Sequence, residues 1–195
     1  MERWVLLRKG ADFEAIGKKY QISPRLACLI RNRDVIGEEA VDRYLNGTIS
    51  DLYDGMLMKD MDKAIDILKE KILEDKKIRV IGDYDIDGVN ATYILLEGLE
   101  RLGADVDSDI PDRISDGYGL NRHLVERAYK AGVDTIITCD NGIAAADEIA
   151  YGKEMGMTVI VTDHHEIPFD ERDGEKRYRI PPADAVMDPK QPDCL

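Results

Sequence analysis

The chain has 195 residues, 44% of them hydrophobic, so it is long enough to bury a sizeable core in one domain, with or without an appended helical piece. No apolar run reaches the length of about eighteen residues that a membrane span requires, and the N-terminus lacks the layout of a secretory signal. The formal charge of −13 argues against nucleic-acid binding by the whole surface, because a phosphate backbone is normally met by basic side chains. Carboxylates that hold cations would reverse this charge locally, and a basic surface could also lie in polypeptide beyond this chain.

The cysteines favour a reducing compartment. Cys28, Cys139 and Cys194 are odd in number, far apart and not in metal-knuckle spacing. We therefore expect free thiols in a cytoplasmic protein.

Residues 1 to about 50 are expected to form short helices joined by loops. Ser23-Pro24 is a typical helix start, with proline in the first turn. A second short helix is expected over 38–45, ending at Asn46-Gly47. A longer amphipathic helix begins near Lys59 and has apolar residues at helical spacing, namely Met61, Ala64, Ile65, Leu68 and Ile72. We expect these side chains to pack in a core, and residues 1–76 to form a helical N-terminal region.

From Lys77 the pattern changes to a regular alternation of strands and helices. Strands are expected over 78–81, 104–110, 134–139 and 157–162, and helices over 89–102, 121–132 and 143–155. This alternation is typical of an α/β domain whose mostly parallel sheet carries helices on both faces. The sequence therefore predicts a doubly wound sheet within residues 77–195.

The first expected strand leads into an acidic loop. Asp83, Asp85 and Asp87 alternate, which places three carboxylates on one side of an extended segment. Such carboxylates repel one another unless a cation compensates, and ligands of open α/β sheets bind beyond the carboxyl ends of the strands. A solvated acidic turn is the alternative for this loop alone. An EF-hand is excluded, because position twelve of the loop is Ile94 rather than glutamate.

The third and fourth expected strands end in further candidate ligands. Asp140 precedes Asn141-Gly142, which is common turn chemistry and uninformative alone. Asp163-His164-His165 is more specific, because adjacent histidines near acids at neighbouring strand ends favour a metal site over a structural role. A set of oxygen ligands with one or two imidazoles suits Mn²⁺, Mg²⁺ or Fe²⁺. The carboxylates suffice for two ions about 4 Å apart, the arrangement that activates water and clamps a phosphodiester.

These segments resemble the successive motifs of the DHH phosphoesterases: 82–88, then 140–143, then 163–165. Within that superfamily, residues 110–113 and 116–121 resemble the RecJ group of single-strand-specific 5′→3′ DNA exonucleases, and the resemblance covers essentially the whole chain. It implies hydrolysis of single-stranded DNA phosphodiesters by metal-activated water, in DNA repair and recombination. It also implies Mn²⁺ or Mg²⁺ as cofactor, with two ions bound, and a single-strand-binding protein as a candidate partner.

The resemblance assigns the metal ligands residue by residue. It implies that Asp85, Asp87, Asp140 and His164 ligate the metals. Asp83 belongs to the same acidic cluster and is expected to ligate or to support a ligand.

The same resemblance assigns the catalytic and substrate-binding side chains. His165 is expected to contact the scissile phosphate or to orient its neighbour, and Asp163 to fix an imidazole. Arg113 would hold a phosphate by its fork of donors, and Tyr118 lies in the matching substrate-side loop. A surface ion pair with a nearby aspartate is the alternative for Arg113.

The chain departs from the family pattern in a few places. The superfamily has a further metal-ligating aspartate downstream of the double histidine, and this chain ends about thirty residues past His165. Asp188-Pro189 stands where the family commonly has Asn-Pro, and Asn90 where threonine is usual. We therefore expect an N-terminal fragment of a longer protein, with its DHH domain incomplete at the C-terminus, so that the isolated fragment need not be active.

Three other functions fit part of the pattern. A different DHH member would act on short RNA, cyclic dinucleotides or pyrophosphate, although the helical N-terminal region favours the RecJ group. A non-catalytic DHH scaffold would have lost ligands, whereas each ligand position within reach is filled. A phosphoacceptor module would have no use for His164-His165.

Overall fold

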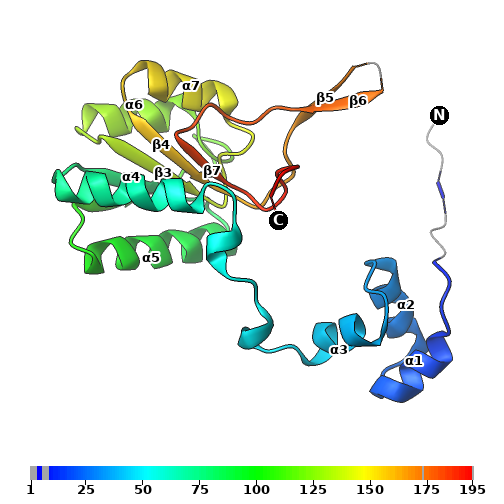
Figure 1. The fold of residues 1–195 in the computed structure, drawn as a ribbon. Coiled ribbons are helices and arrows are strands. Elements are labelled where there is room, and N and C mark those ends of the chain that lie inside the picture. Colours follow the sequence, from blue (N-terminus) through cyan, green and yellow to red (C-terminus); the bar gives the residue numbers. More distant parts are fainter. Residues whose placement is uncertain (1–3, 6–8, 173, 195) are drawn as a thin grey trace. The chain divides into compact units, whose positions relative to one another are not determined.

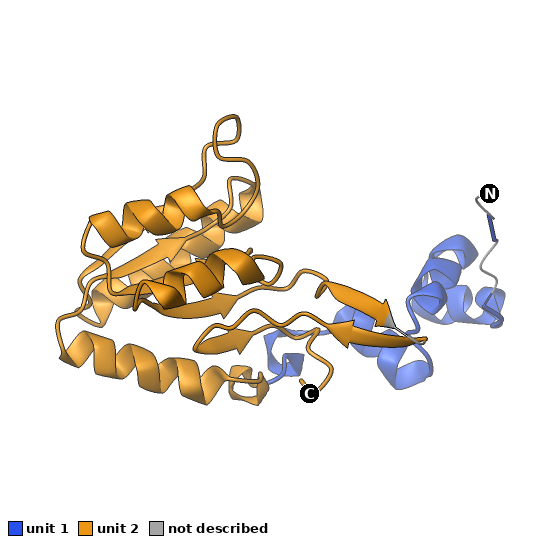
Figure 2. Cartoon of the chain, turned by 90° about the horizontal axis from the view of Figure 1, so that it is seen from above, with its two compact units in different colours: residues 1–53 blue, residues 54–195 orange. Residues whose placement is uncertain are grey.

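The computed structural model describes residues 4–5, 9–172 and 174–194, and it divides into two compact units, Met1–Tyr53 and Asp54–Leu195 (Figure 2). The first unit holds the helices α1 (Phe13–Tyr20), α2 (Pro24–Asn32) and α3 (Glu38–Asn46). The predicted start of α2 is confirmed, because the Ser23 side chain accepts a hydrogen bond from the Leu26 N–H at 3.2 Å. Ala27, Ile30 and Val41 are buried in this unit.

The second unit is built on a sheet of five strands in the order β2-β1-β3-β4-β7 (Figure 1). All neighbouring strands of this sheet are parallel, which confirms the predicted fold class. The strands are β1 (Ile78–Ile81), β2 (Val106–Asp109), β3 (Thr135–Cys139), β4 (Thr158–Thr162) and β7 (Ala185–Met187). The first four lie within the predicted strand ranges, and β7 was not predicted.

Helices cover both faces of this sheet. On one face, α6 (Arg122–Lys130) and α7 (Ala146–Glu154) pack over a core that includes Ile81 and Ile136. On the other face, α4 (Met61–Leu73) and α5 (Ile86–Arg101) pack over Val80 and Ile137, so successive residues of one strand serve opposite cores. Each fully buried aliphatic side chain contributes roughly 1.5–3 kcal/mol, so the two cores together hold the sheet in place.

Helix α4 belongs to the sheet unit. Its apolar face, with Ala64 almost fully buried, packs against the core that β1 and β3 supply. The sequence pattern grouped this helix with the N-terminal helices and divided the chain after residue 76. In the structure α4 lies in the compact unit that begins at Asp54, because its apolar face packs on the sheet.

An antiparallel hairpin, β5 (Phe169–Arg172) with β6 (Glu175–Tyr178), separates β4 from β7 and extends away from the sheet (Figure 1). It was not predicted, since β6 is exposed along its whole length and shows no buried face. No helix in the described part of the chain has the length and apolarity needed to cross a membrane.

The strand order sets the place of the site. From β1 the chain passes to β2 on one side, and it then returns across β1 to reach β3 on the other side. The crevice between the carboxyl ends of β1 and β3 is therefore the topological switch point, where sheets of this class bind ligands.

Candidate metal centre

Two glycines bring the end of β1 against the start of α5. A Cβ on Gly82 would collide with the Thr92 hydroxyl, and a Cβ on Gly88 would lie 2.5 Å from the Asp83 carbonyl oxygen and 2.6 Å from its nitrogen. Only glycine permits this approach at Gly88, since the contacts are to backbone atoms that cannot move aside. The result is that the loop after β1 folds tightly enough to bury Asp83.

Asp83 is fully buried, and neither of its carboxylate oxygens has a hydrogen-bond partner among the described residues. Removing an ionised carboxylate from water without a donor costs several kcal/mol, so such groups are normally paired or bound to a metal. This pair of buried, unpartnered oxygens is the strongest indication in the structure of a cation site.

Asp85 caps the helix that follows. Its Oδ1 accepts from the backbone N–H of Asp87 at 2.9 Å and of Gly88 at 3.0 Å, which starts α5 at Ile86, three residues before the predicted start. The Gly88 hydrogen bond holds the pKa of the Asp85 carboxyl below its ordinary value, with Asp87 N–H adding to the effect. Asp87 is exposed in the first turn of the same helix.

Asp140 stands at the end of β3 in a left-handed backbone conformation, with φ of 59°. Its Oδ1 lies 2.7 Å from Nε2 of His164, and its buried Oδ2 has no partner in the described chain. Burial raises the pKa of the Asp140 carboxyl, and the nearby Asp85 charge acts in the same direction. Asp140 therefore offers one free oxygen and one that already faces an imidazole.

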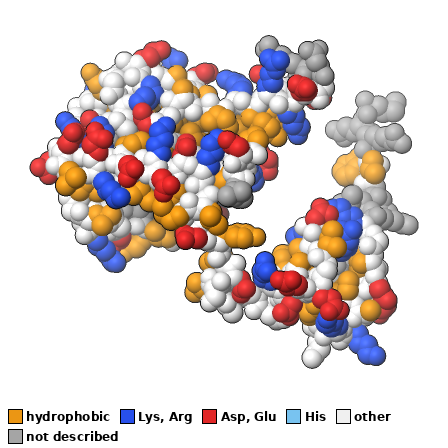
Figure 3. Space-filling view, in the orientation of Figure 1, with side chains coloured by type: hydrophobic (Ala, Val, Ile, Leu, Met, Phe, Trp, Pro, Cys, Tyr) orange, Lys and Arg blue, Asp and Glu red, His pale blue; other side chains and the backbone are white. Residues whose placement is uncertain are grey.

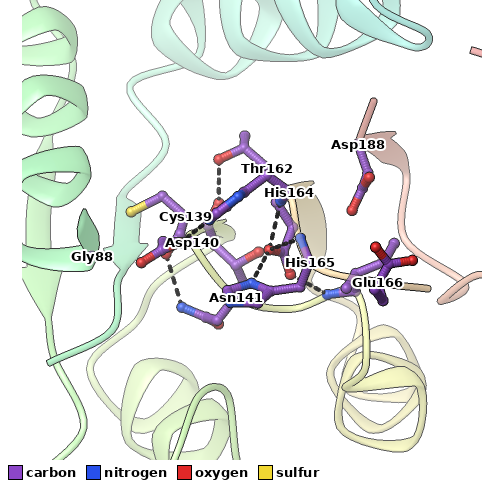
Figure 4. Close-up of polar contacts among 12 residues, drawn as sticks. Gly88, Cys139, Asp140, Asn141, Thr162, His164, His165, Glu166 and Asp188 are labelled. Atoms are coloured by element: carbon purple, nitrogen blue, oxygen red, sulfur yellow. Dashed lines mark hydrogen bonds and ion pairs between the residues drawn. The ribbon is translucent and has the colours of Figure 1, made fainter. Parts of the chain in front are cut away.

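Asp163 fixes the double-histidine segment after β4, whose His164 and His165 are labelled in Figure 4. Its Oδ1 accepts from the backbone N–H groups of His164 at 2.7 Å and His165 at 3.2 Å, and from Nδ1 of His165 at 2.7 Å. Its Oδ2 accepts from the Ile143 N–H at 2.9 Å. The hydrogen bond with Asp163 raises the pKa of His165. Because Nδ1 of His165 is engaged, its Nε2 is the nitrogen that faces the site.

Three aromatic groups connect the site to the loop after β2. The Tyr118 hydroxyl lies 3.1 Å from Nε2 of His165. The rings of Tyr118 and Tyr84 pack edge to face, with 6.0 Å between their centres. The Arg113 guanidinium stacks over Tyr84 at 5.2 Å from the ring centre. Burial raises the pKa of Tyr118 to about 12, so the phenol stays protonated at neutral pH.

The ligand atoms form two groups that share one residue. Asp83, Asp85 and Asp140 bring carboxylate oxygens within 4.8 Å of one another, and Asp140, His164 and His165 do the same. Two overlapping sets with a shared carboxylate, oxygen-rich on one side and imidazole-rich on the other, fit a pair of divalent cations.

The predicted site residues converge with two exceptions. Arg113 reaches the site only through Tyr84, and Asp87 lies outside both ligand groups. Asp87 instead lines a cavity of about 610 Å³ between α4 and α5 that Asp140 and His164 also line. His165 falls within a ligand group, whereas the family resemblance led us to expect a contact with phosphate.

Two buried polar residues of this edge were missed. Asp188, directly after β7, is fully buried with Oδ2 unpartnered in the described chain, and burial raises its pKa. Asn141 is 2% exposed and lies between strand ends. The only sequence signals were the Asp-Pro departure at 188 and the position of Asn141 within an acidic motif.

The charge distribution supplies no large basic patch on the face seen in Figure 3, where acidic and basic side chains are interspersed. Many of the acidic side chains form ion pairs within the sheet unit. For example, Oδ1 of Asp107 lies 2.6 Å from Nε of Arg79, and Oδ2 of Asp184 lies 2.6 Å from Nζ of Lys153. These ion pairs account for part of the acidic composition without involving the site.

Comparison with known proteins agrees with this geometry. The model of the DHH family, N-terminal domain, matches residues 77–195. The chain is 38% identical over 193 residues to the single-stranded-DNA-specific exonuclease RecJ of Bacillus subtilis, covering 98% of this chain and 23% of that protein. The chain thus spans about a quarter of the length of this curated relative.

Two solved structures are similar to the described fold. An exonuclease RecJ bound to manganese has a TM-score of 0.62 and 35% identity, over 74% of this chain and 34% of that chain. RecJ in complex with Mn²⁺ from Thermus thermophilus has a TM-score of 0.60 and 29% identity, over 93% of this chain and 24% of that chain.

Proposed function

Since the chain belongs to the DHH family, we propose that it forms the metal-binding part of an enzyme that hydrolyses phosphodiester bonds of single-stranded DNA. The observation that carries the proposal is Asp83, whose two buried oxygens lack partners among the described residues and lie beside Asp140 at the switch point. The RecJ proteins that the chain resembles are single-stranded-DNA-specific exonucleases, and two solved ones hold manganese.

Mn²⁺ or Mg²⁺ is the proposed cofactor, with Asp83, Asp85, Asp140 and His164 as ligands and Asp87 as a further ligand from the first turn of α5. When bound, two such ions would acidify a water molecule and neutralise charge at the phosphoryl oxygens. Asp140 is shared by both ligand groups and would therefore help to hold both ions.

The remaining side chains would handle the substrate. His165 holds its proton on Nδ1 toward Asp163, and its raised pKa favours a cationic ring that can stabilise charge on a phosphoryl oxygen. Tyr118 can donate its hydroxyl proton to the same oxygens, because its pKa of about 12 keeps it protonated. Arg113 is proposed to hold a phosphate group of the strand, with Tyr84 keeping its guanidinium in place.

Finer points of the proposal come from the resemblance alone. They are 5′→3′ polarity, a role in DNA repair and recombination, a cytoplasmic location and contact with a single-strand-binding protein.

A hydrolysis panel with the full-length protein that contains this chain tests the function. Labelled single-stranded DNA, duplex DNA, short RNA and a cyclic dinucleotide are incubated with Mn²⁺, beside the Asp140→Asn variant and a sample with chelator. Release of nucleotides from single-stranded DNA, lost in both controls, supports the proposal. Cleavage confined to the short RNA or the cyclic dinucleotide would favour a different DHH activity, and binding of DNA and metal without cleavage would favour a scaffold.

A further inference from the structure

Asn141 connects the two strands that carry the carboxylates of the metal centre. Its Nδ2 donates to the carbonyl oxygen of Ile81 at 3.1 Å and to that of Cys139 at 3.0 Å (Figure 4). Ile81 is the last residue of β1, and Cys139 is the last residue of β3. One amide group therefore bonds to the final carbonyl of each strand at the switch point.

The two hydrogen bonds of Asn141 lie just beyond the last backbone pairing between β1 and β3. Ile81 pairs with Thr138 in the parallel register, and beyond this pair the N–H of Asp140 turns to the Thr162 carbonyl of β4 instead. The two strands have no further backbone pairing in the described chain, although each leads within two residues to a ligand, Asp83 or Asp140. The side chain of Asn141 thus joins the two strand ends directly behind those ligands.

The turn that follows β3 contains two residues with positive φ, a backbone conformation that most residues adopt only at a cost. Asp140 has φ of 59°, which costs a non-glycine residue about 1 kcal/mol. Gly142 has φ of 111°, and a Cβ there would collide with the side chain of Thr138. Conformations of this kind persist only where the surroundings hold them, and the amide bonds of Asn141 are the contacts that hold this turn to β1.

Asn141 also keeps a buried acceptor unpaired. Its Oδ1 has no partner among the described residues, and the amide cannot be reversed because both of its partners are carbonyl acceptors. An unsatisfied buried acceptor costs about 1–3 kcal/mol. The amide of Asn141 thus forms its two donated bonds while its own oxygen stays unpaired among the described residues.

We propose that Asn141 is a positioning residue that sets the distance between the carboxylates after β1 and Asp140, and with it the spacing of two bound ions. The inference rests on the proposed function, because it takes the shared-ligand metal centre as given. Asn141 itself would contact neither metal nor substrate, and it would act through Asp83 and Asp140.

The test is made in the full-length protein and compares Asn141→Ala with a matched control, Gln191→Ala. Gln191 is also a buried amide, 3% exposed, whose Nε2 donates to the Val186 carbonyl at 2.7 Å, and it lies outside both ligand groups. Calorimetric titration with Mn²⁺ should show an affinity loss of about 10- to 100-fold for Asn141→Ala, as for other residues that orient metal ligands, and little loss for Gln191→Ala. Electron paramagnetic resonance of the Mn²⁺-loaded chain should show the coupled two-ion signal in the wild type and the control, and a weakened or altered signal in Asn141→Ala.

The outcomes separate the proposal from the function on which it rests. If the wild type binds no Mn²⁺, the metal centre itself is wrong. If the wild type binds and both variants lose affinity in proportion to their loss of melting temperature, Asn141 is merely structural and the proposal is overturned. Should Asn141→Ala fail to fold, Asn141→Ser decides, because its hydroxyl has a single proton and cannot donate to both carbonyl groups. An unchanged coupled signal in that variant would overturn the proposal.

Discussion

Nε2 of His164, on the loop after β4, lies 2.7 Å from Oδ1 of Asp140, on the loop after β3. The two side chains face each other at the carboxyl edge of the sheet, and each belongs to the ligand group that also contains His165. Their approach places an imidazole and a carboxylate where one cation could be held by both, and Asp140 is the residue that the two ligand groups share.

Replacing Asp140 by asparagine should separate metal binding from stability. Asparagine has the shape of the Asp140 side chain but lacks the negative charge that both ligand groups share. The Mn²⁺ affinity of the variant should therefore fall by more than the roughly 10- to 100-fold loss that is typical when a residue that only orients a metal ligand is replaced. Burial raises the pKa of Asp140, so its ionised form destabilises the metal-free fold, and the melting temperature in chelator should hold or rise. Asp147→Asn, at an exposed position on α7, is the control and should change neither quantity. A lowered melting temperature without loss of affinity would contradict the assignment.

The stability of the metal-free chain should depend on His165 in a defined pH range. The hydrogen bond with Asp163 raises the pKa of His165 above its ordinary value of 6.5. A histidine whose pKa is raised on folding binds its proton more tightly in the folded state, so its contribution is fully present below pH 6.5 and disappears as the pH rises through the folded-state pKa. In chelator, the melting temperature of the wild type should therefore exceed that of His165→Gln most at about pH 5–6. A difference that grows toward about pH 9 would show that the sign is wrong.

Gly88 should be intolerant of a methyl group, and Gly98 in the same helix should accept one. A Cβ at Gly88 would meet backbone atoms of Asp83 at 2.5 Å and 2.6 Å, whereas nothing lies within 4 Å of a Cβ at Gly98. Urea unfolding should show Gly88→Ala destabilised by about 1–3 kcal/mol or more. Gly98→Ala should be more stable than the wild type by about 0.5–1 kcal/mol, because alanine is the better helix former. Equal effects at both positions would mean that the close approach at the acidic loop does not exist.

Arg113 should contribute to binding of single-stranded DNA, and lysine should not replace it. The guanidinium carbon lies 5.2 Å from the centre of the Tyr84 ring, and the compact ammonium of lysine does not reproduce the contact of a planar guanidinium. Fluorescence anisotropy with a 5′-phosphorylated oligonucleotide should show about a tenfold loss of affinity in both Arg113→Ala and Arg113→Lys, or about 1.4 kcal/mol. Arg122→Ala is the matched control, since Arg122 also stacks on a tyrosine, Tyr151, at 5.2 Å but outside the site. Equal losses in all three variants would indicate a general effect of positive charge.

Much of the sheet unit could be predicted because its buried strands are short apolar runs separated by helical patterns. Ile78–Ile81 and Thr135–Cys139 are buried along their whole length, which leaves a continuous signal in the sequence. β7 has only three residues and follows a proline pair, so it gives no comparable run. The hairpin β5–β6 has no buried face on β6, so no periodicity marks it.

The convergence of the carboxylates could be predicted from their places at strand ends, but their individual environments could not. Asp83 and Asp87 belong to one sequence motif, yet Asp83 is fully buried and Asp87 is exposed. That difference depends on how closely the end of β1 approaches the start of α5 at Gly82 and Gly88, which is a property of packing between elements. The same holds for Asn141, because its partners Ile81 and Cys139 include a residue sixty positions away in the chain.

The hydrogen bonds of the Asp163 carboxyl group limit how far the site can adjust to ions of different size. It takes hydrogen bonds from the double-histidine segment through one oxygen and from Ile143, beyond the Asp-Asn-Gly turn, through the other. The two segments are thereby joined into a single block, and neither can shift without carrying the other. Ions of different radius would meet a preset frame at this edge of the sheet, rather than separate arms that adjust one by one.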